Sequence, residues 1–298
     1  MWNRLAYIIG LGAILLCACQ RVAPELEPDH APEAQDTRQV ATLTLQASKA
    51  ANTKALSLDG NTLNAYWKNT ENVVVYDDAG NSLGTLDVIP GEGEKPSSAT
   101  LSGTLDVTGV TAGDNLTLWI PRMVWNYTGQ VGTLTGENSI EELYDYASAA
   151  VEVATVGENT ITTTGTAHFN NEQSIYRFGF KENENALTVR LFVMGAASNK
   201  LVRSVKSGLP EYGALKVKPA AATSELLYVS LRNESVDPAS AGDTFRFIVI
   251  SADQSAYLGT KAIPASVMDR QGKFISAKGV VVNKVLMPQG STSATAVW

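Results

Sequence analysis

The segment TLTLQA, residues 42–47, alternates polar and apolar side chains with a period of two. This pattern places Leu43, Leu45 and Ala47 on one face of a half-buried β-strand, because successive side chains of a strand point to opposite sides. The same alternation recurs in NLTLWI (115–120), SIYRFGF (174–180), ALTVRLFV (186–193) and TFRFIVI (244–250). Turn-forming Gly, Asn and Asp separate these runs at short intervals, as in antiparallel sheets, and no long amphipathic helices alternate with them as a parallel β/α fold requires.

One helix signal interrupts the β pattern. In SIEELYDYASAA (139–150), Ser139 and Glu142 have the spacing of a capping box, in which each side chain binds the backbone of the other residue. The residues after this box therefore predict a short helix, from Ile140 to about Ala149.

The length of 298 residues suggests about two domains of ordinary size. In the polar stretch GENTITTTGTA (157–167), Ile161 is the only bulky apolar residue, and a dense cluster of strand signals starts near Gln173. We therefore expect an all-β fold of two antiparallel β-sandwich domains in tandem, 41–166 and 167–298, with one short helix in the first.

The N-terminal residues indicate export and lipid attachment. Residues 1–18 carry one charge, Arg4, and are apolar or small from 5 to 16. This combination is typical of a secretory signal and is too short for a bilayer-spanning helix, which needs about 20 apolar residues. The segment ends in LCAC (16–19), which resembles a bacterial lipobox. We therefore expect a lipoprotein signal peptide that is removed before Cys19, and acylation of that cysteine.

The chain contains two cysteines, Cys17 and Cys19. Once the signal is removed and Cys19 is acylated, no thiol is left for a disulfide or a cysteine zinc site. Residues 19–40 are rich in proline and acidic residues and poor in large apolar side chains, which predicts a disordered tether. Gln20, directly after the lipidated cysteine, favours the outer membrane as the place of anchoring.

Neither the charge nor the motifs point to nucleic acid or catalysis. The formal net charge of −7 would repel a phosphate backbone. GNSLG (80–84) matches G-x-S-x-G, but strand signals on both sides predict a hairpin instead of a hydrolase elbow. The two histidines, His30 and His168, lie far apart in the sequence, and Asp77 and Asp78 lack the acid ladder of a calcium loop. We expect no catalytic residue, cofactor or metal site.

Aromatic residues concentrate in the first half of the chain. Two interpretations are open: packing in the core, which is the more frequent use of such residues, or a platform that stacks on a sugar. The residues concerned are Trp67, Trp119, Trp125, Tyr127 and Tyr144.

The first strand leads into a loop with a basic residue. In ATLTLQASKAANTKALSL (41–58), the alternating strand is followed by a short polar loop in which Lys54 precedes the small residue Ala55. Three further segments have features of one family of surface proteins: AYWKNTENVVVYDDAGN (65–81), ELYDYASA (142–149) and the final pair Val297-Trp298. Together these segments resemble the fimbrillins, lipoprotein precursors of the type V pili of Gram-negative anaerobes.

The resemblance implies transthyretin-like β-sandwiches and a processing step. In fimbrillins a trypsin-like protease cuts the loop after the first strand, and this strand leaves together with the lipid. In this chain the cut would fall between Lys54 and Ala55. Lys49 is the alternative, whereas a cut at Arg38 would leave the strand in place. The best-known fimbrillins have arginine at the processing site, where this chain has lysine. The displaced strand would remove Leu43, Leu45 and Ala47 from the first domain.

In the family, a C-terminal strand of another subunit fills the groove that opens, a case of β-strand addition. Two segments of the tail 278–298 are candidate donors, KGVVVNKVLM (278–287) and STSATAVW (291–298). The side chains that would enter a neighbour's groove are Val280, Val282, Val297 and Trp298. The alternative for 278–287 is that it closes the sheet of its own domain.

Residues and resemblance together predict a structural and adhesive pilin subunit, not an enzyme, located on the cell surface and in fimbriae. Its expected partners are other pilin subunits, the outer membrane through the lipid before processing, and a host or bacterial surface ligand. Nucleic acid is not an expected partner. The alternative is a non-polymerising outer-membrane lipoprotein that binds a glycan or host ligand. A hydrolase centred on Ser82 is a third hypothesis.

Overall fold

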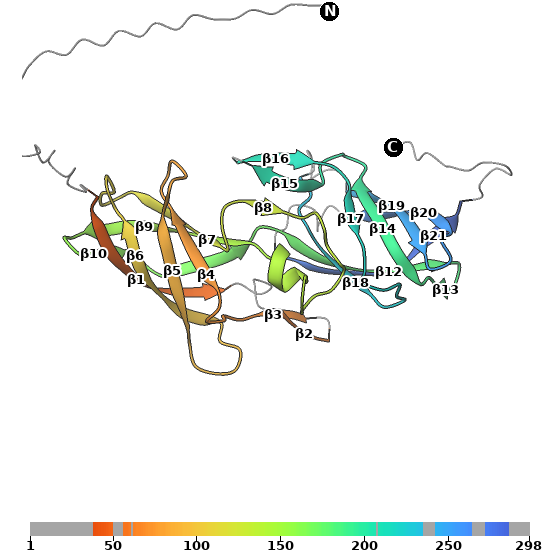
Figure 1. Ribbon diagram of the computed structural model, residues 1–298, viewed down its shortest axis with the longest axis horizontal. Helices are drawn as coiled ribbons and strands as arrows, with labels where there is room; N and C mark the ends of the chain where they lie inside the picture. Colours follow the sequence, from red (N-terminus) through yellow and green to blue (C-terminus); the bar gives the residue numbers. More distant parts are fainter. Residues whose placement is uncertain are drawn as a thin grey trace, which may run out of the picture. The chain divides into compact units, whose positions relative to one another are not determined.

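The computed structural model describes residues 38–49, 56–60, 62–206, 208–234, 242–263 and 272–285. These residues form two large and two small β-sheets and almost no helix (Figure 1). In this described part of the chain, no helix combines the length and hydropathy needed to cross a membrane. The all-β class predicted from the alternating runs is therefore confirmed.

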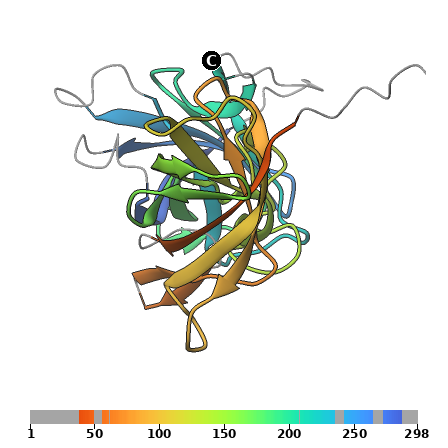
Figure 2. The same ribbon diagram turned by 90° about the vertical axis from the view of Figure 1, so that its left-hand side faces the viewer.

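The first large sheet closes on itself. It consists of β10 (Thr160–Thr163), β1 (Val40–Lys49), β11 (Ala167–Asn171), β9 (Ala147–Val156), β7 (Asn115–Ile120), β4 (Asn72–Tyr76), β5 (Ser82–Pro90) and β6 (Ser98–Asp106). Because β6 also pairs with β1, and β9 pairs with both β10 and β11, hydrogen bonding continues round the whole sheet. Figure 2 views the chain from the side of this sheet, with β1 in red-orange.

The core of the first sheet is formed by the inward residues of its alternating strands. Leu43, Val75, Leu86, Leu101 and Leu116 have no exposed surface. The inward positions of 115–120 are those expected from the period of two, since Leu116, Leu118 and Ile120 are fully buried. These strands therefore fold as they do because one face of each can be removed from water.

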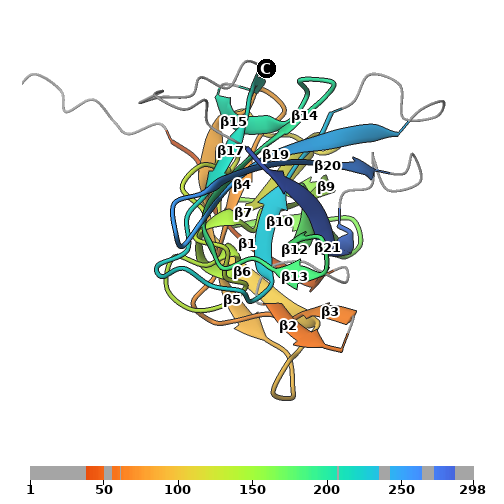
Figure 3. The same cartoon turned by 90° about the vertical axis from the view of Figure 1, so that its right-hand side faces the viewer.

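The second large sheet contains the later strands. Its order is β13 (Asn185–Ala186), β12 (Ser174–Glu182), β21 (Phe274–Lys284), β20 (Ala256–Ile263), β19 (Asp243–Ser251), β14 (Val189–Ala196) and β17 (Leu215–Val217), and β18 (Leu227–Leu231) pairs with β12. Figure 3 shows β19, β20 and β21 next to one another. The core is aromatic: the ring centroid of Phe178 lies 5.2 Å from that of Phe247 and 6.2 Å from that of Phe245.

The buried face predicted for residues 186–193 in the second sheet is wrong. The run 186–193 predicts Leu187, Val189, Leu191 and Val193 on the buried face. In the structure the pairing of β14 with β19 shifts between Val189 and Leu191, where a bulge inserts one residue. Beyond this bulge Phe192 and Met194 are the buried side chains. The alternation is real on each side of the bulge, but its phase changes there.

Two small sheets complete the fold. One consists of β16 (Leu209–Tyr212), β15 (Val202–Lys206) and β8 (Trp125–Asn126), and the other of β2 (Leu56–Asp59) and β3 (Thr62–Ala65). Through β8 and its neighbours, residues from the first half enter the core of the second sheet, namely Trp119, Trp125, Tyr127 and Tyr146. The sheet pairing changes from the first to the second large sheet between Asn171 and Ser174.

The helix is shorter than expected. It is η1, a five-residue π-helix from Ile140 to Tyr144, and Ser139 caps it by accepting a hydrogen bond from the backbone N of Glu142. Asp145 then has extended backbone angles, and β9 begins at Ala147. The predicted continuation to about Ala149 is wrong because these alanines pair in the first sheet, where Ala149 lies opposite Leu118. Tertiary pairing outweighs the helix preference of alanine here.

Candidate functional site

The strand β1 has a neighbour on each of its edges. On one edge it is antiparallel to β6, with pairs from Val40 and Asp106 to Ser48 and Ser98. On the other edge β10 and then β11 run parallel to it, at Leu43–Ile161 and at Ala47–Ala167. The strand therefore fills a slot between β6 and the pair β10 and β11. Without β1 the sheet would open there, and two rows of backbone groups would lose their partners.

The inward face of β1 is buried along the strand. Ala41, Leu43, Leu45 and Ala47 expose 2%, 0%, 5% and 1% of their surface. The alternation predicted from TLTLQA is therefore present, and it extends by one step towards the N-terminus.

The walls of the slot match the side chains of β1 in size. Leu45 lies opposite Leu101, and Ala47 lies opposite Ala99. Leu43 lies opposite Gly103 on β6. A Cβ atom on Gly103 would be only 2.4 Å from the backbone oxygen of Thr85, so β5 approaches too closely at this position for any side chain.

Polar contacts cover the outward face of β1. The hydroxyls of Thr44 and Ser102 are 2.8 Å apart, and Gln46 donates to the hydroxyl of Thr100 at 3.0 Å. The hydroxyl of Ser48 is 2.7 Å from Nδ1 of His168. These contacts are exposed to water, so that they contribute less than the buried face.

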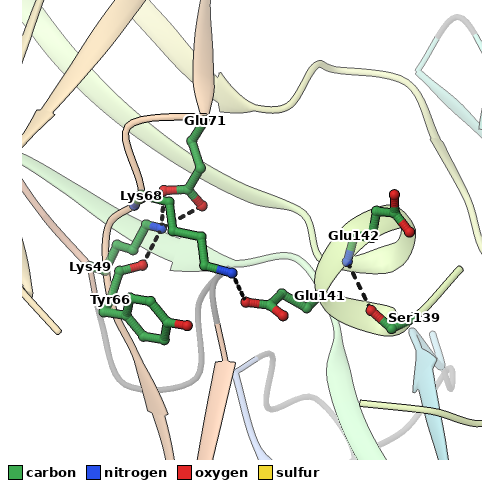
Figure 4. Close-up of polar contacts among 7 residues, drawn as sticks. All are labelled: Lys49, Tyr66, Lys68, Glu71, Ser139, Glu141 and Glu142. Atoms are coloured by element: carbon green, nitrogen blue, oxygen red, sulfur yellow. Dashed lines mark hydrogen bonds and ion pairs between the residues drawn. The ribbon is translucent and has the colours of Figure 1, made fainter. Parts of the chain in front are cut away.

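At the end of β1 the next inward residue is a lysine. The ammonium of Lys49 donates to both carboxylate oxygens of Glu71, at 2.8 and 2.6 Å, and to the backbone oxygen of Tyr66 at 2.8 Å (Figure 4). It also lies 4.2 Å from the ring centre of Trp67. The side chains of Lys49 and Glu71 are 0% and 3% exposed, which makes this a buried ion pair. We call Tyr66, Trp67 and Glu71 the lysine socket.

The lysine socket lies in the segment that connects β3 to β4. The carboxylate of Glu71 accepts a hydrogen bond from the backbone N of Lys68 at 3.1 Å, which fixes the turn on itself. Trp67 packs edge-on against Phe169 of β11, with ring centres 5.3 Å apart. Its backbone N donates to the oxygen of Pro96 at 2.7 Å. The socket is thus held by elements other than β1.

Acidic side chains surround the outer side of the socket. An open groove of about 740 Å³ is lined by Lys68, Thr70, Glu71, Gly136, Glu137, Glu141 and Glu142. The ammonium of Lys68 forms an ion pair with Glu141 at the start of η1 (Figure 4). Partial burial lowers the pKa of Lys68, but the hydrogen bond to Glu141 and the charge of that carboxylate raise this pKa above its ordinary value. Lys68 is therefore a charged partner of Glu141.

The predicted site residues fall into three groups, of which the third, Val280 and Val282, belongs to β21. Cys19, Lys54, Ala55, Val297 and Trp298 lie outside the described residues. Leu43, Leu45, Ala47 and Lys49 come together on the inward face of β1. Reading the sequence places Lys49 in the loop, as an alternative cleavage site, whereas the structure buries it. The missed signal is its phase, since Lys49 continues the alternation of Leu43, Leu45 and Ala47.

The candidate donor residues Val280 and Val282 lie in the second sheet of their own chain. Strand β21 is parallel to β12 and antiparallel to β20. Val280 and Val282 are 2% and 0% exposed in the core of that sheet. A donor role for this strand would require it to leave both neighbours, so that the alternative of closing its own sheet describes β21 in this structure.

The motifs that could indicate sugar binding, hydrolysis or metal binding are part of the core or of a turn in the structure. Trp67, Trp119, Trp125, Tyr127 and Tyr144 are buried, so these five offer no exposed platform for a sugar. GNSLG covers the end of the turn between β4 and β5, where Asp77 accepts two hydrogen bonds from Asn81, and the first residues of β5. Within the described ranges, no group of three or more His, Cys, Asp or Glu side chains is arranged to hold a metal ion.

Comparison with solved structures finds matches at low sequence identity. A structure described as that of a proposed cell adhesion protein of Bacteroides ovatus matches 84% of this chain and 97% of its own, with a TM-score of 0.42 and 11% identity. A fimbrial assembly protein of Parabacteroides distasonis matches 81% and 90%, with a TM-score of 0.39 and 13% identity. A tip fimbrial protein of Porphyromonas gingivalis, truncated at its C-terminus, matches 74% and 81%, with a TM-score of 0.35 and 10% identity.

No protein-family model matches the chain, and no curated protein matches it.

Proposed function

We propose that this chain is a structural and adhesive pilin subunit of cell-surface fimbriae. It is exported as an outer-membrane lipoprotein anchored through Cys19, cut after Lys54 by a trypsin-like protease, and polymerised by strand exchange. The observation that carries this proposal is the position of β1. An N-terminal strand that fills a slot with partners on both edges is an element that another strand of the same pattern can replace.

The proposed cut lies between two elements with different attachments. Lys54 falls between β1, which ends at Lys49, and β2, which starts at Leu56. Lys49 is a poor substrate for a trypsin-like protease, because its side chain is buried against Glu71. Leu56 is itself buried and packs with Leu63 and Ile175, so the β2–β3 hairpin would stay in place after the cut.

The energetics favour refilling of the slot. Burial of the four apolar inward side chains of β1 contributes roughly 5–8 kcal/mol, and the backbone hydrogen bonds on two edges add to it. Domains of this size are stable by only about 5–15 kcal/mol in total. An empty slot would therefore leave the domain marginal, and an incoming strand would be held firmly without a covalent bond.

The remaining parts of the chain have roles in the same proposal. Residues 1–18 are the signal, and 19–40 form the tether to the lipid. The two transthyretin-like sandwich domains are those expected as 41–166 and 167–298, but with the boundary between Asn171 and Ser174, because β11 (Ala167–Asn171) pairs in the first sheet. Because β21 fills its own sheet, the segment that this chain donates is 291–298, with Val297 and Trp298 entering the slot of a neighbouring subunit of different sequence.

The N-terminus of surface material tests the processing step. Fibres from cells that express the natural chain should start at Ala55 and lack lipid. Lys54→Gln should leave an acylated, uncut chain. Lys95→Gln, which changes an exposed lysine in the loop between β5 and β6, should be processed normally. A mature terminus upstream of Ala41 would contradict removal of the strand. If the natural chain keeps Cys19 and its lipid, it is a non-polymerising surface lipoprotein instead.

Deletion of 291–298 tests the donor segment. We expect a soluble monomer with the far-ultraviolet circular dichroism of the full chain and no fibres by electron microscopy. Fibres of normal length would show that the donor lies elsewhere. An unfolded product would show that these residues belong to the chain's own core.

A further inference from the structure

We propose that the slot of β1 selects its incoming strand by charge: the replacing strand carries lysine or arginine at the position of Lys49 and comes from a chain of different sequence. This inference rests on the proposed strand exchange. It adds a specificity determinant, the lysine socket of Tyr66, Trp67 and Glu71, which stays behind when β1 leaves.

Removal of β1 takes the counterion away from a buried carboxylate. Glu71 is 3% exposed in its side chain and receives two hydrogen bonds from the ammonium of Lys49. Breaking a buried ion pair by removing one partner is strongly unfavourable, because the remaining charge keeps the cost of desolvation without the attraction. A strand with an uncharged residue at this position would therefore bind more weakly, because Glu71 would be buried without a counterion.

Among the residues that the structure describes, the surroundings of Glu71 do not supply a replacement cation. Among the described residues that line the adjoining groove, Lys68 is the only cation, and its ammonium is paired with Glu141. If Lys68 turned to Glu71, Glu141 would lose its partner beside two further acids, Glu137 and Glu142. The charge of this region thus favours a cation from the incoming strand.

The other parts of the socket also suit a cation. The backbone oxygen of Tyr66 accepts a hydrogen bond from Lys49 at 2.8 Å, and the Trp67 ring lies 4.2 Å from the ammonium. An aromatic face, a carbonyl oxygen and a carboxylate together recognise the positive charge and its N–H donors. A methionine or leucine would satisfy only the contact with the ring.

The chain's own candidate donors do not fit this slot. Residues 286–298 contain no lysine or arginine. In 278–284 the residues in phase are Lys278, Val280, Val282 and Lys284. If residues 278–284 fill the slot with one of these lysines in the socket, which requires Lys284 there in the direction of β1 or Lys278 in the opposite direction, the other lysine falls at the place of Leu43, which is fully buried. The slot therefore suits a strand with several apolar residues and a single terminal cation.

The experiment measures strand exchange in the full chain after it has been cut between β1 and β2, with the cut confirmed by intact mass. Fluorescent peptides replace the cut strand, and their capture is followed by anisotropy. The peptides are VATLTLQASK (residues 40–49), the same sequence with Lys49→Arg or Lys49→Met, and a scrambled control. We expect the lysine and arginine peptides to bind, and the methionine peptide to bind about 100-fold more weakly.

The same series on the Glu71→Gln chain identifies the carboxylate as the cause. The preference for lysine over methionine should fall at least about tenfold there, as a double-mutant cycle requires for a direct contact. Equal binding of the lysine and methionine peptides to the natural chain would overturn the charge requirement while leaving strand exchange intact. If no peptide binds, the strand exchange itself is wrong and the inference falls with it. Should Glu71→Gln fail to fold, the peptide series on the natural chain decides alone.

Discussion

Leu45 of β1 lies directly opposite Leu101 of β6, and their side chains are 5% and 0% exposed. This contact links β1, the strand that we propose is removed, to β6, which stays as one wall of the slot. Leu45→Ala should lower the free energy of unfolding by about 2–5 kcal/mol, since it removes buried methyl groups and leaves a cavity. Urea denaturation of the uncut chain, followed by circular dichroism, measures this change.

Thr42→Ala is the matched control for this strand. Thr42 lies on the outward, exposed face of β1, so the change should alter stability by no more than about 0.5 kcal/mol. Equal losses from both variants would mean that the inward face of β1 is not the side that holds the strand.

Gly103 provides a second test of how tightly the slot is built. A Cβ at this position would lie 2.4 Å from the oxygen of Thr85 and 3.1 Å from the Cα of Leu86, both in the backbone of β5. Gly103→Ala should therefore force β5 and β6 apart and cost about 1–3 kcal/mol. Gly195→Ala, whose nearest new contact is the Cβ of Ala214 at 3.9 Å, should change stability by less than about 1 kcal/mol. Comparable thermal midpoints for the two variants would contradict the close approach.

The anchoring prediction concerns the N-terminus and is independent of the slot. Cys19→Ser should abolish acylation, because a hydroxyl cannot form the thioether that carries the lipid. Incorporation of labelled palmitate into cells that express each chain measures this. Label in the Cys19→Ser chain would show that LCAC is not a lipobox.

The strands could be predicted where polar and apolar residues alternate without interruption. In β1 and β19 the inward residues, such as Leu43 and Phe247, are those that the period of two selects. In β14 the residues 191–194 are all apolar, so that the sequence contains no mark of the bulge after Val189. When both faces of a strand are apolar, the sequence pattern does not reveal which face is buried. The pairing with the neighbouring strand decides it.

The candidate site could be predicted only in its apolar part. Lys49 continues the inward phase of β1, but a buried lysine is too rare to be expected without knowledge of its partner. That partner, Glu71, is 22 residues away. The turn that brings it close depends on Trp67, which packs against Phe169 and donates its backbone N–H to the oxygen of Pro96. Local sequence patterns do not predict this long-range contact, because the tertiary fold creates it.

Alkaline pH should lower the free energy of unfolding through Tyr176, a residue of the second core. Burial disfavours the phenolate, which raises the pKa of Tyr176 from 10.0 to about 12. Above pH 10 the unfolded chain loses this proton while the folded chain keeps it, so the folded state binds more protons and stability falls as pH rises from about 10 to about 12. Tyr176→Phe removes this contribution. Between pH 9 and pH 11, the natural chain should lose about 1 kcal/mol more than the variant, measured by urea denaturation at both pH values. Equal losses would mean that the Tyr176 phenol can ionise inside the folded protein at little cost.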